Sequence, residues 1–306
     1  MGFEYGIKLY QRIFEMNKET KQLLKDFSKG SASFISNLNS TFVSILRMCV
    51  LSSLKVAKKS KKCEQLKTTK SCCILGNGPS LKDDLEHGRV RLDGNDVMGV
   101  NMFCWDPSFR VVKPRFYFLI DGAYFNPPER HKERVDNLIT SLNEVDWDMY
   151  LMIPSATVSG SKLLQSVNNE HIKVIRINST SVDGFRGFRH WAYRHRLGMP
   201  HCQTVVNFAV CVAINMHYDN IYLYGVDHTW TRDLSVDDNN VVYMGVRHVY
   251  DKNLTRVKKE HNFAKMLGQF AKMFKAHYLL EEYSKSERVK IWNCSSDSFL
   301  DAYERF

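Results

Sequence analysis

The feature that most constrains this sequence is a series of seven short, continuous apolar runs, most of them ending at a small polar residue. They alternate with stretches of helical spacing at 131–143, 183–196, 204–217 and 261–282. Continuous apolar runs are typical of strands buried on both faces, as in a parallel sheet covered by helices. The runs lie at 72–75, 97–100, 116–120, 150–153, 174–175, 221–224 and 289–292. The pattern predicts an α/β fold with a single doubly wound, mostly parallel sheet.

Small polar side chains follow six of the predicted strands. In an open parallel sheet the carboxyl ends of the strands meet at one edge, and ligands bind in the crevice beside it. Six such side chains could together read a base edge, a ribose and a phosphate. They are Asn77, Asn101, Asp121, Ser155, Asp227 and Asn293. The set predicts a ligand site at this edge, although Asn, Asp and Ser are also ordinary turn residues.

The first predicted strand runs into a glycine turn, Gly76-Asn77-Gly78-Pro79-Ser80. The glycines allow backbone N–H groups to approach a ligand, and the helix that begins near Ser80 attracts negative charge at its N-terminus. The turn matches neither the dinucleotide fingerprint nor the P-loop, whose Lys-Ser/Thr pair is absent. We expect a nucleotide-phosphate site at these five residues; the alternative is a tight turn of structural importance only.

Residues 228–260 form an unusually long connection, which in a compact domain is usually functional. We expect a lid that excludes water and brings Arg or Tyr groups to a leaving phosphate; the alternative is an oligomer contact. His261 follows directly, at the start of a predicted helix. A helix N-terminus disfavours a cation, so it would keep an imidazole neutral and able to take a proton. The alternative for His261 is a capping or surface residue.

Several ordered motifs give the chain a family resemblance over roughly residues 71–300. The sequence resembles the bacterial sialyltransferases that decorate lipooligosaccharide, glycosyltransferase family 42. It is also similar to the related GNGPSL-type proteins known as motility accessory factors or pterin-diphosphokinase-like proteins. The matching pieces are 74–81 (ILGNGPSL), Val100-Asn101, Thr204, 221–227 (IYLYGVD), His261 and 293–295 (NCS).

The resemblance implies a Rossmann-like, GT-A-type variant and a set of site residues. His261 corresponds to the family's general base, and Tyr243 or Tyr250 would stand in for its phosphate-binding tyrosines. The residues implied to contact the donor are Gly76, Asn77, Gly78, Pro79, Ser80, Asn101, Asp121, Ser155, Thr204, Asp227, Asn293 and Ser295.

The implied activity is that of an inverting, metal-independent glycosyltransferase. It would move an acidic sugar (sialic acid, Kdo or a related nonulosonate) from a CMP donor to lipooligosaccharide or another surface glycan. The DxD-like Asp146-Trp147-Asp148 precedes a predicted strand and so belongs to the opposite edge of the sheet. One rival is a pyrophosphokinase-type phosphotransferase, whose Mg²⁺ Asp121 and Asp227 could hold. A second rival is an inactive membrane-bound scaffold.

The net charge of +10 is almost entirely confined to residues 1–70, which carry +9 of it. Residues 71–306 are nearly neutral, which counts against a nucleic-acid binder, because a binder would carry its basic stripe on the folded domain. We therefore expect two parts, a basic amphipathic helical arm with a linker at 1–70 and a catalytic domain at 71–306 with its lid at about 228–260.

The arm contains an apolar stretch at 34–54, followed by a lysine cluster at 55–62. Polar residues interrupt the stretch, so it falls short of the ~18 uninterrupted apolar residues of a spanning helix. An apolar face beside lysines suits a helix lying in an anionic membrane interface. The alternative is a helix packed on the body or on a second copy, as in a homo-oligomer.

The eight cysteines show no metal-ligand spacing, and no cleavable signal peptide precedes them. The chain is thus expected to be cytoplasmic and peripheral to the inner face of the membrane.

Overall fold

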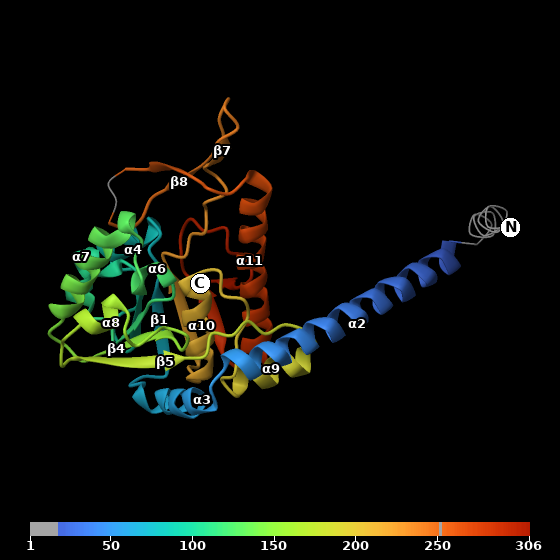
Figure 1. The fold of residues 1–306 in the computed structure, drawn as a ribbon, viewed down its shortest axis with the longest axis horizontal. Helices are drawn as coiled ribbons and strands as arrows, with labels where there is room; N and C mark the ends of the chain where they lie inside the picture. Colours follow the sequence, from blue (N-terminus) through green and yellow to red (C-terminus); the bar gives the residue numbers. More distant parts are fainter. Residues whose placement is uncertain (1–17, 251–252) are drawn as a thin grey trace.

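The computed structural model describes residues 18–250 and 253–306 (Figure 1). Residues 1–17, the first part of the arm expected at 1–70, lie outside the described residues. The described chain opens with α2 (Lys18–Leu51), a helix of 34 residues that projects away from a compact body. Two short helices, α3 (Leu54–Lys61) and η1 (Lys62–Leu66), then lead to the first strand.

The body is built on an eight-stranded sheet in which every strand pair is parallel. Its spatial order is β11-β10-β6-β1-β2-β3-β4-β5, so the chain winds outward from β1 in both directions. The strands are β1 (Ser71–Leu75), β2 (Asp96–Val100), β3 (Phe116–Phe118), β4 (Met149–Pro154), β5 (Ile172–Ile177), β6 (Asn220–Tyr224), β10 (Lys290–Asn293) and β11 (Glu304–Arg305). The prediction of a doubly wound, mostly parallel, Rossmann-like sheet with a helical arm is confirmed.

Helices cover both faces of the sheet because side chains along each strand alternate between two apolar clusters. In β1, Cys72 and Ile74 join one cluster, and Cys73 and Leu75 join the other. The first cluster packs against α9 (Arg186–Arg194), α10 (Val205–Asn215) and α11 (Phe263–Ser286). The second packs against α4 (Ser80–Glu86), α5 (Ser108–Val112) and α7 (Lys132–Asn143). Short elements fill the connections: η2 (Phe103–Trp105), α6 (Gly122–Phe125), η3 (Glu129–His131) and α8 (Lys162–Ser166).

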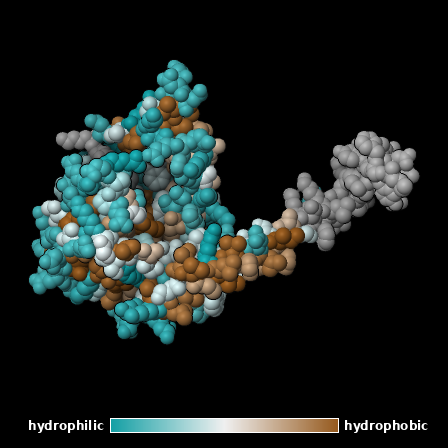
Figure 2. All heavy atoms as spheres, viewed as in Figure 1, coloured by the Kyte–Doolittle hydropathy of each residue, from teal (hydrophilic) through white to brown (hydrophobic). Residues whose placement is uncertain are grey.

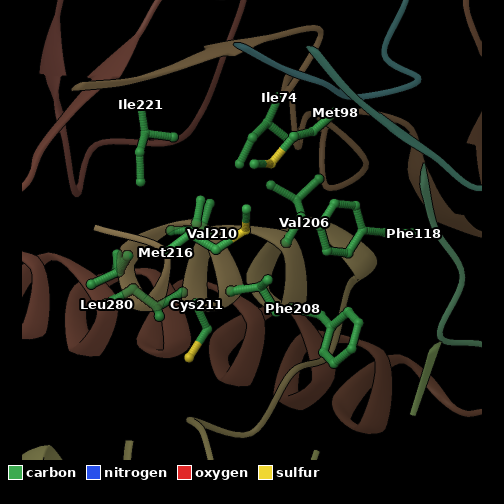
Figure 3. Packing of buried hydrophobic residues seen from close by; sticks show 14 of the residues in the cluster. Ile74, Met98, Phe118, Val206, Phe208, Val210, Cys211, Met216, Ile221 and Leu280 are labelled. Atoms are coloured by element: carbon green, nitrogen blue, oxygen red, sulfur yellow. The ribbon is translucent and has the colours of Figure 1, made fainter. Parts of the chain in front are cut away.

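Helix α10 is the centre of the core. Every residue of α10 is buried, since the helix lies between the sheet and α11 (Figure 3). It begins at the carboxyl edge of the sheet with Thr204 as its N-cap. The packing therefore fixes the N-terminus of this helix beside the predicted ligand edge.

The arm is anchored to the body at the C-terminal end of α2. Ser44 donates to the carbonyl oxygen of Asp183 at 3.0 Å, and Thr41 accepts from the N–H of Phe185 at 3.0 Å. Residues 54–66 also pack on the body, where Ala57 and Cys63 are buried. The segment that carries the lysine cluster at 55–62 thus covers part of the body, and its lysines are exposed.

The lid is folded rather than irregular. It forms a three-stranded antiparallel sheet of β7 (Leu234–Val236), β8 (Val242–Val246) and β9 (Thr255–Lys258). Val242 and Met244 pack against Met266 and Phe270 of α11, which gives this small sheet its own apolar core.

Candidate active site

A cavity of about 750 Å³ lies at the carboxyl edge of the sheet, under the lid. It sits beside β1 and β6, where the strand order reverses direction, and ligands bind at such switch points. Eight of the predicted residues line it: Asn77, Gly78, Pro79, Asn101, Asp121, Thr204, Asp227 and Tyr250. The structure therefore brings together residues that follow β1, β2, β3 and β6, as the strand pattern predicts.

Asn77 and Asn101 are the most informative of these residues. The Asn77 amide donates to the carbonyl oxygen of Val100 at 3.2 Å. The side-chain oxygens of Asn77 and Asn101 are both buried and have no hydrogen-bond partner among the described residues. A buried polar atom without a partner is costly, so these two oxygens are available to accept hydrogen bonds from a ligand that donates them.

The glycine turn is held by Asp227 rather than left open for a phosphate. The Asp227 carboxylate accepts from the backbone N–H of Ser80 at 3.0 Å and from the Ser80 hydroxyl. Burial raises the pKa of Asp227, and the two bonds from Ser80 oppose that shift. Because this carboxylate already occupies the N-terminus of α4, the expected phosphate contact at Ser80 is replaced by an internal one.

The glycines of the turn are needed for close packing on the segment that follows β6. A Cβ at Gly78 would lie 2.5 Å from an Asp227 carboxylate oxygen, and one at Gly76 would overlap the carbonyl oxygen of Gly225. Gly78 lines the cavity, whereas Gly76 and Ser80 do not. The turn at Gly76–Gly78 and the turn at Gly225–Asp227 are thus packed directly against each other.

The N-terminus of α10, unlike that of α4, opens on the cavity. The Thr204 side chain accepts from the backbone N–H of Asn207, and the Asn207 side chain accepts from the backbone N–H of Thr204. Thr204, Val205 and Val206 line the cavity. The Asn207 side-chain nitrogen is buried without a partner among the described residues. A helix N-terminus favours negative charge, so this end of the cavity suits a phosphate or a carboxylate.

Three arginines add positive charge to the wall. They are Arg134 on α7, Arg232 and Arg247. Arg232 is paired with Asp297 at 2.7 and 2.9 Å, whereas the Nε of Arg134 is buried without a partner in the described part of the chain. Sequence reasoning missed Arg134, because on an amphipathic helix nothing local distinguishes it from a solvated cation.

The lid reaches the site through the segment after β8. The N–H of Val249 donates to the carbonyl oxygen of Asn77 at 2.9 Å, which fastens the lid to the glycine turn. Tyr250 lines the cavity and stacks on His248 with ring centroids 5.0 Å apart. Tyr243 lies away from the cavity wall, with the Arg256 guanidinium 4.0 Å above its ring. Of the two predicted tyrosines, Tyr250 lines the cavity and Tyr243 does not.

His261 is also away from the wall. It is half-buried between β9 and α11, and the imidazoles that line the cavity are those of His228 and His248. The sequence did contain a signal for His228, since this residue directly follows Asp227, one of the residues predicted at the ligand edge.

Ser155, Asn293 and Ser295 make structural contacts instead of lining the cavity. Ser295 accepts from the N–H of Val226 at 2.9 Å, and Asn293 donates to the carbonyl oxygen of Leu300 at 2.8 Å. Both side chains are buried. They hold the C-terminal segment against the turn after β6. Ser155 directly follows β4, which is separated from the switch point by β1, β2 and β3, and its N–H donates to the carbonyl oxygen of Ile177.

Two charged motifs outside the cavity, the basic helix α9 and the DxD-like motif at 146–148, form ion pairs with other parts of the chain. In α9, Arg189 pairs with Glu282 at 3.0 Å and Arg194 pairs with Glu287, so this cationic segment is a helix face docked on α11. Asp146 pairs with Lys113 at 3.0 Å at the start of β4, the edge opposite the cavity. The expectation that the DxD-like motif is structural agrees with this position.

Comparisons with known proteins give little further information. No family model matches the sequence, and no curated protein matches it. Among solved structures the chain is similar to the MAf glycosyltransferase from Magnetospirillum magneticum AMB-1, with 14% identity and a TM-score of 0.48. The similarity covers 78% of this chain and 34% of that one, so the chain spans about a third of that protein's length. The function must therefore be argued from the site itself.

Proposed function

We propose that this protein is an inverting, metal-independent glycosyltransferase that uses a CMP-linked acidic sugar, such as sialic acid, Kdo or a related nonulosonate. Its acceptor would be lipooligosaccharide or another surface glycan. The observation that carries the proposal is the pair of unsatisfied oxygens of Asn77 and Asn101, buried on one wall of the cavity. Two carboxamide acceptors side by side at a switch point suit the amino group of a base and the hydroxyls of a ribose.

The rest of the cavity suits an anionic sugar nucleotide. Its volume lies within the range of about 300–1,000 Å³ for small-molecule sites. The N-terminus of α10 and the guanidinium groups of Arg134 and Arg247 supply positive potential for a phosphate and a sugar carboxylate. An acidic sugar would use both anion contacts, whereas a neutral sugar would use one.

Inversion needs one base, which takes the proton of the acceptor hydroxyl as that oxygen attacks the anomeric carbon. The leaving phosphate needs positive charge, which the arginines can provide. The cavity wall supports a mechanism in which arginines neutralise the leaving group.

The Mg²⁺-dependent pyrophosphokinase is the alternative, and the two carboxylates that the sequence assigned to Mg²⁺ do not favour it. Asp227 is bonded to Ser80, and Asp121 caps α6 by accepting from the N–H of Ala123 at 2.9 Å. A phosphotransferase would need such groups free for Mg²⁺ near the phosphates.

The first test is ligand binding followed by transfer. Thermal shift with CMP, CDP, UDP, GDP and ATP, each with and without Mg²⁺, should show stabilisation by CMP that is unchanged by EDTA. Asn77→Ala and Asn101→Ala should abolish that shift, whereas Asn239→Ala, at an exposed lid turn, should retain it. Mg²⁺-dependent stabilisation by ATP alone would favour the pyrophosphokinase. Transfer from CMP-sialic acid or CMP-Kdo in excess EDTA then tests the reaction.

We place the enzyme at the inner face of the cytoplasmic membrane through its arm. The apolar side chains along α2 are exposed, among them Phe42 at 60% and Val50 at 80%. Figure 2 shows them as a continuous apolar band on the projecting helix. The lysines of α3 follow directly, which suits an anionic surface.

A further inference from the structure

Three polar side chains form a buried line behind the cavity. The Nε2 atoms of His228 and His277 are 3.0 Å apart, and His277 Nδ1 is 3.0 Å from the Tyr303 hydroxyl. The three residues are 5%, 0% and 5% exposed. They come from the turn after β6, the middle of α11 and the residue before β11. Three separate elements thus converge on a hydrogen-bonded chain in an otherwise apolar interior.

One end of this chain opens on the cavity. His228 is part of the cavity wall, and its hydrogen bond to His277 uses Nε2, which leaves Nδ1 for a ligand. Its backbone has φ of 51°, in the left-handed region that residues other than glycine seldom adopt. Strained conformations of this kind are concentrated at functional sites. The turn after β6 therefore holds the His228 ring in one fixed place.

Burial favours the neutral form of both imidazoles. Burial lowers the pKa of His228 to about 3, and burial together with the neighbouring His228 lowers the pKa of His277 well below its usual range. Around His228 lie the rings of Trp230 and Phe274, and its neighbour Asp227 is bonded to Ser80. Of the described titratable groups, His277 is thus the one that His228 contacts.

In a chain of neutral imidazoles, each ring has one donor nitrogen and one acceptor nitrogen. If His277 Nδ1–H donates to the Tyr303 oxygen, its Nε2 accepts from His228 Nε2–H, and His228 Nδ1 is left as an acceptor. The reverse order makes His228 Nδ1 a donor. The far end of the chain therefore decides whether His228 Nδ1 takes or gives a proton.

We propose that His228 is the base that takes the proton of the acceptor hydroxyl, and that His277 and Tyr303 are positioning residues that hold its accepting tautomer. This inference rests on the proposed function. The acceptor oxygen forms a bond to the anomeric carbon while the bond from that carbon to the donor phosphate oxygen breaks. The electron pair leaves with the nucleotide phosphate, and the hydroxyl proton moves to His228 Nδ1. The positive charge is then shared with His277 across the Nε2 pair.

The first experiment reads the tautomers directly and does not depend on transfer. Long-range ¹H–¹⁵N spectra of the full chain labelled at histidine should show His228 protonated at Nε2. Tyr303→Phe removes the partner at the far end and should alter the His228 tautomer signals. Tyr278→Phe, on the exposed side of α11, should not alter them. Unchanged His228 signals in Tyr303→Phe would overturn the positioning role.

The second experiment measures transfer and CMP binding separately. His228→Gln should lower kcat at least about 100-fold with CMP affinity retained, as expected for loss of a general base. Tyr303→Phe should lower kcat about tenfold, because loss of a hydrogen-bond partner that orients a functional imidazole typically has an effect of this size. His171→Gln, at the opposite edge of the sheet, serves as the matched control.

The outcomes separate the inference from the proposed function. Transfer by the wild type together with normal transfer by His228→Gln would overturn the inference alone, and loss of transfer in His248→Gln or His261→Gln instead would name the true base. A wild type that neither binds CMP nor transfers a sugar would overturn the proposed function and the base role with it.

Discussion

Gly78 illustrates how single residues shape this site. A Cβ at Gly78 would lie 2.5 Å from an Asp227 carboxylate oxygen and 2.6 Å from the carbonyl oxygen of Gly225. Gly78→Ala must therefore displace the turn after β6 or break the Asp227–Ser80 bonds. We expect a loss of about 1–3 kcal/mol in the free energy of unfolding, typical of overpacking. Urea denaturation measures this loss. Gly187→Ala, with no atom within 4 Å of the added carbon, should show no such loss.

The buried histidines make the stability depend on pH. An unfolded imidazole has a pKa of ~6.5, whereas His228 and His277 stay neutral in the folded protein, so below that pH the unfolded chain binds more protons. The free energy of unfolding should accordingly fall as pH decreases below ~6.5, by about 1.4 kcal/mol per pH unit for each histidine. His277→Gln should remove one such contribution to the slope between about pH 6 and pH 5.

Denaturation at several pH values checks this. His171→Gln, at an exposed position, should retain the wild-type slope. An identical slope in His277→Gln and the wild type would mean that His277 is protonated in the folded state.

At the scale of elements, the lid offers a matched pair of arginines. Arg247 follows β8 and lines the cavity, whereas Arg256 lies in β9 over the ring of Tyr243. Arg247→Ala should raise the KM for the donor about tenfold or more, because a charge-assisted contact to phosphate contributes roughly 1.5–3 kcal/mol. Arg256→Ala should leave KM within about twofold. Steady-state kinetics on both variants decides this, and equal effects would show that the lid acts only as a cover.

Elements also differ in how well the sequence predicts them. Strands β1, β2, β4 and β6 are continuous apolar runs because helices cover both of their faces. Such runs can be recognised in the sequence, so these strands were predicted correctly. Two of the lid strands, β7 and β9, were missed because they are short and have no buried residue; all four residues of β9 are exposed. Solvated strands lack the burial that imposes an apolar pattern.

Only part of the candidate site could be predicted from the sequence, because some of its residues are brought together by helix packing rather than by the order of the strands. Asn77, Asn101 and Asp227 follow strands whose ends must meet, so topology alone brings them together. Arg134 and the His228–His277 contact depend on how helices pack over the sheet, which no local spacing encodes. The same limit applies to His261, whose distance from the cavity wall depends on the path of the lid.

At the scale of the whole molecule, the arm and the body are held in a fixed relation. The apolar window Gly30–Leu51 is long and apolar enough to cross a membrane, with a mean hydropathy of 1.3, so length and composition alone do not exclude a span. Thr41 and Ser44 lie inside this window and are bonded to the body. A spanning helix would have to break those bonds, whereas a helix lying in the interface keeps them. The interfacial arrangement that we propose is therefore the one that leaves these two bonds intact.

Liposome flotation of the full chain tests this arrangement. Ile35, Leu38 and Phe42 share one exposed face of α2, and burying each side chain in lipid is worth about 1.5–3 kcal/mol. Replacing all three by Ser should reduce flotation with vesicles containing phosphatidylglycerol more than tenfold, while Val111→Ser with Val158→Ser, exposed on the body, should not. Alkaline carbonate should extract the wild-type protein, because an interfacial helix does not cross the bilayer. Retention after carbonate would instead indicate that α2 leaves its contacts with Asp183 and Phe185 and spans the membrane.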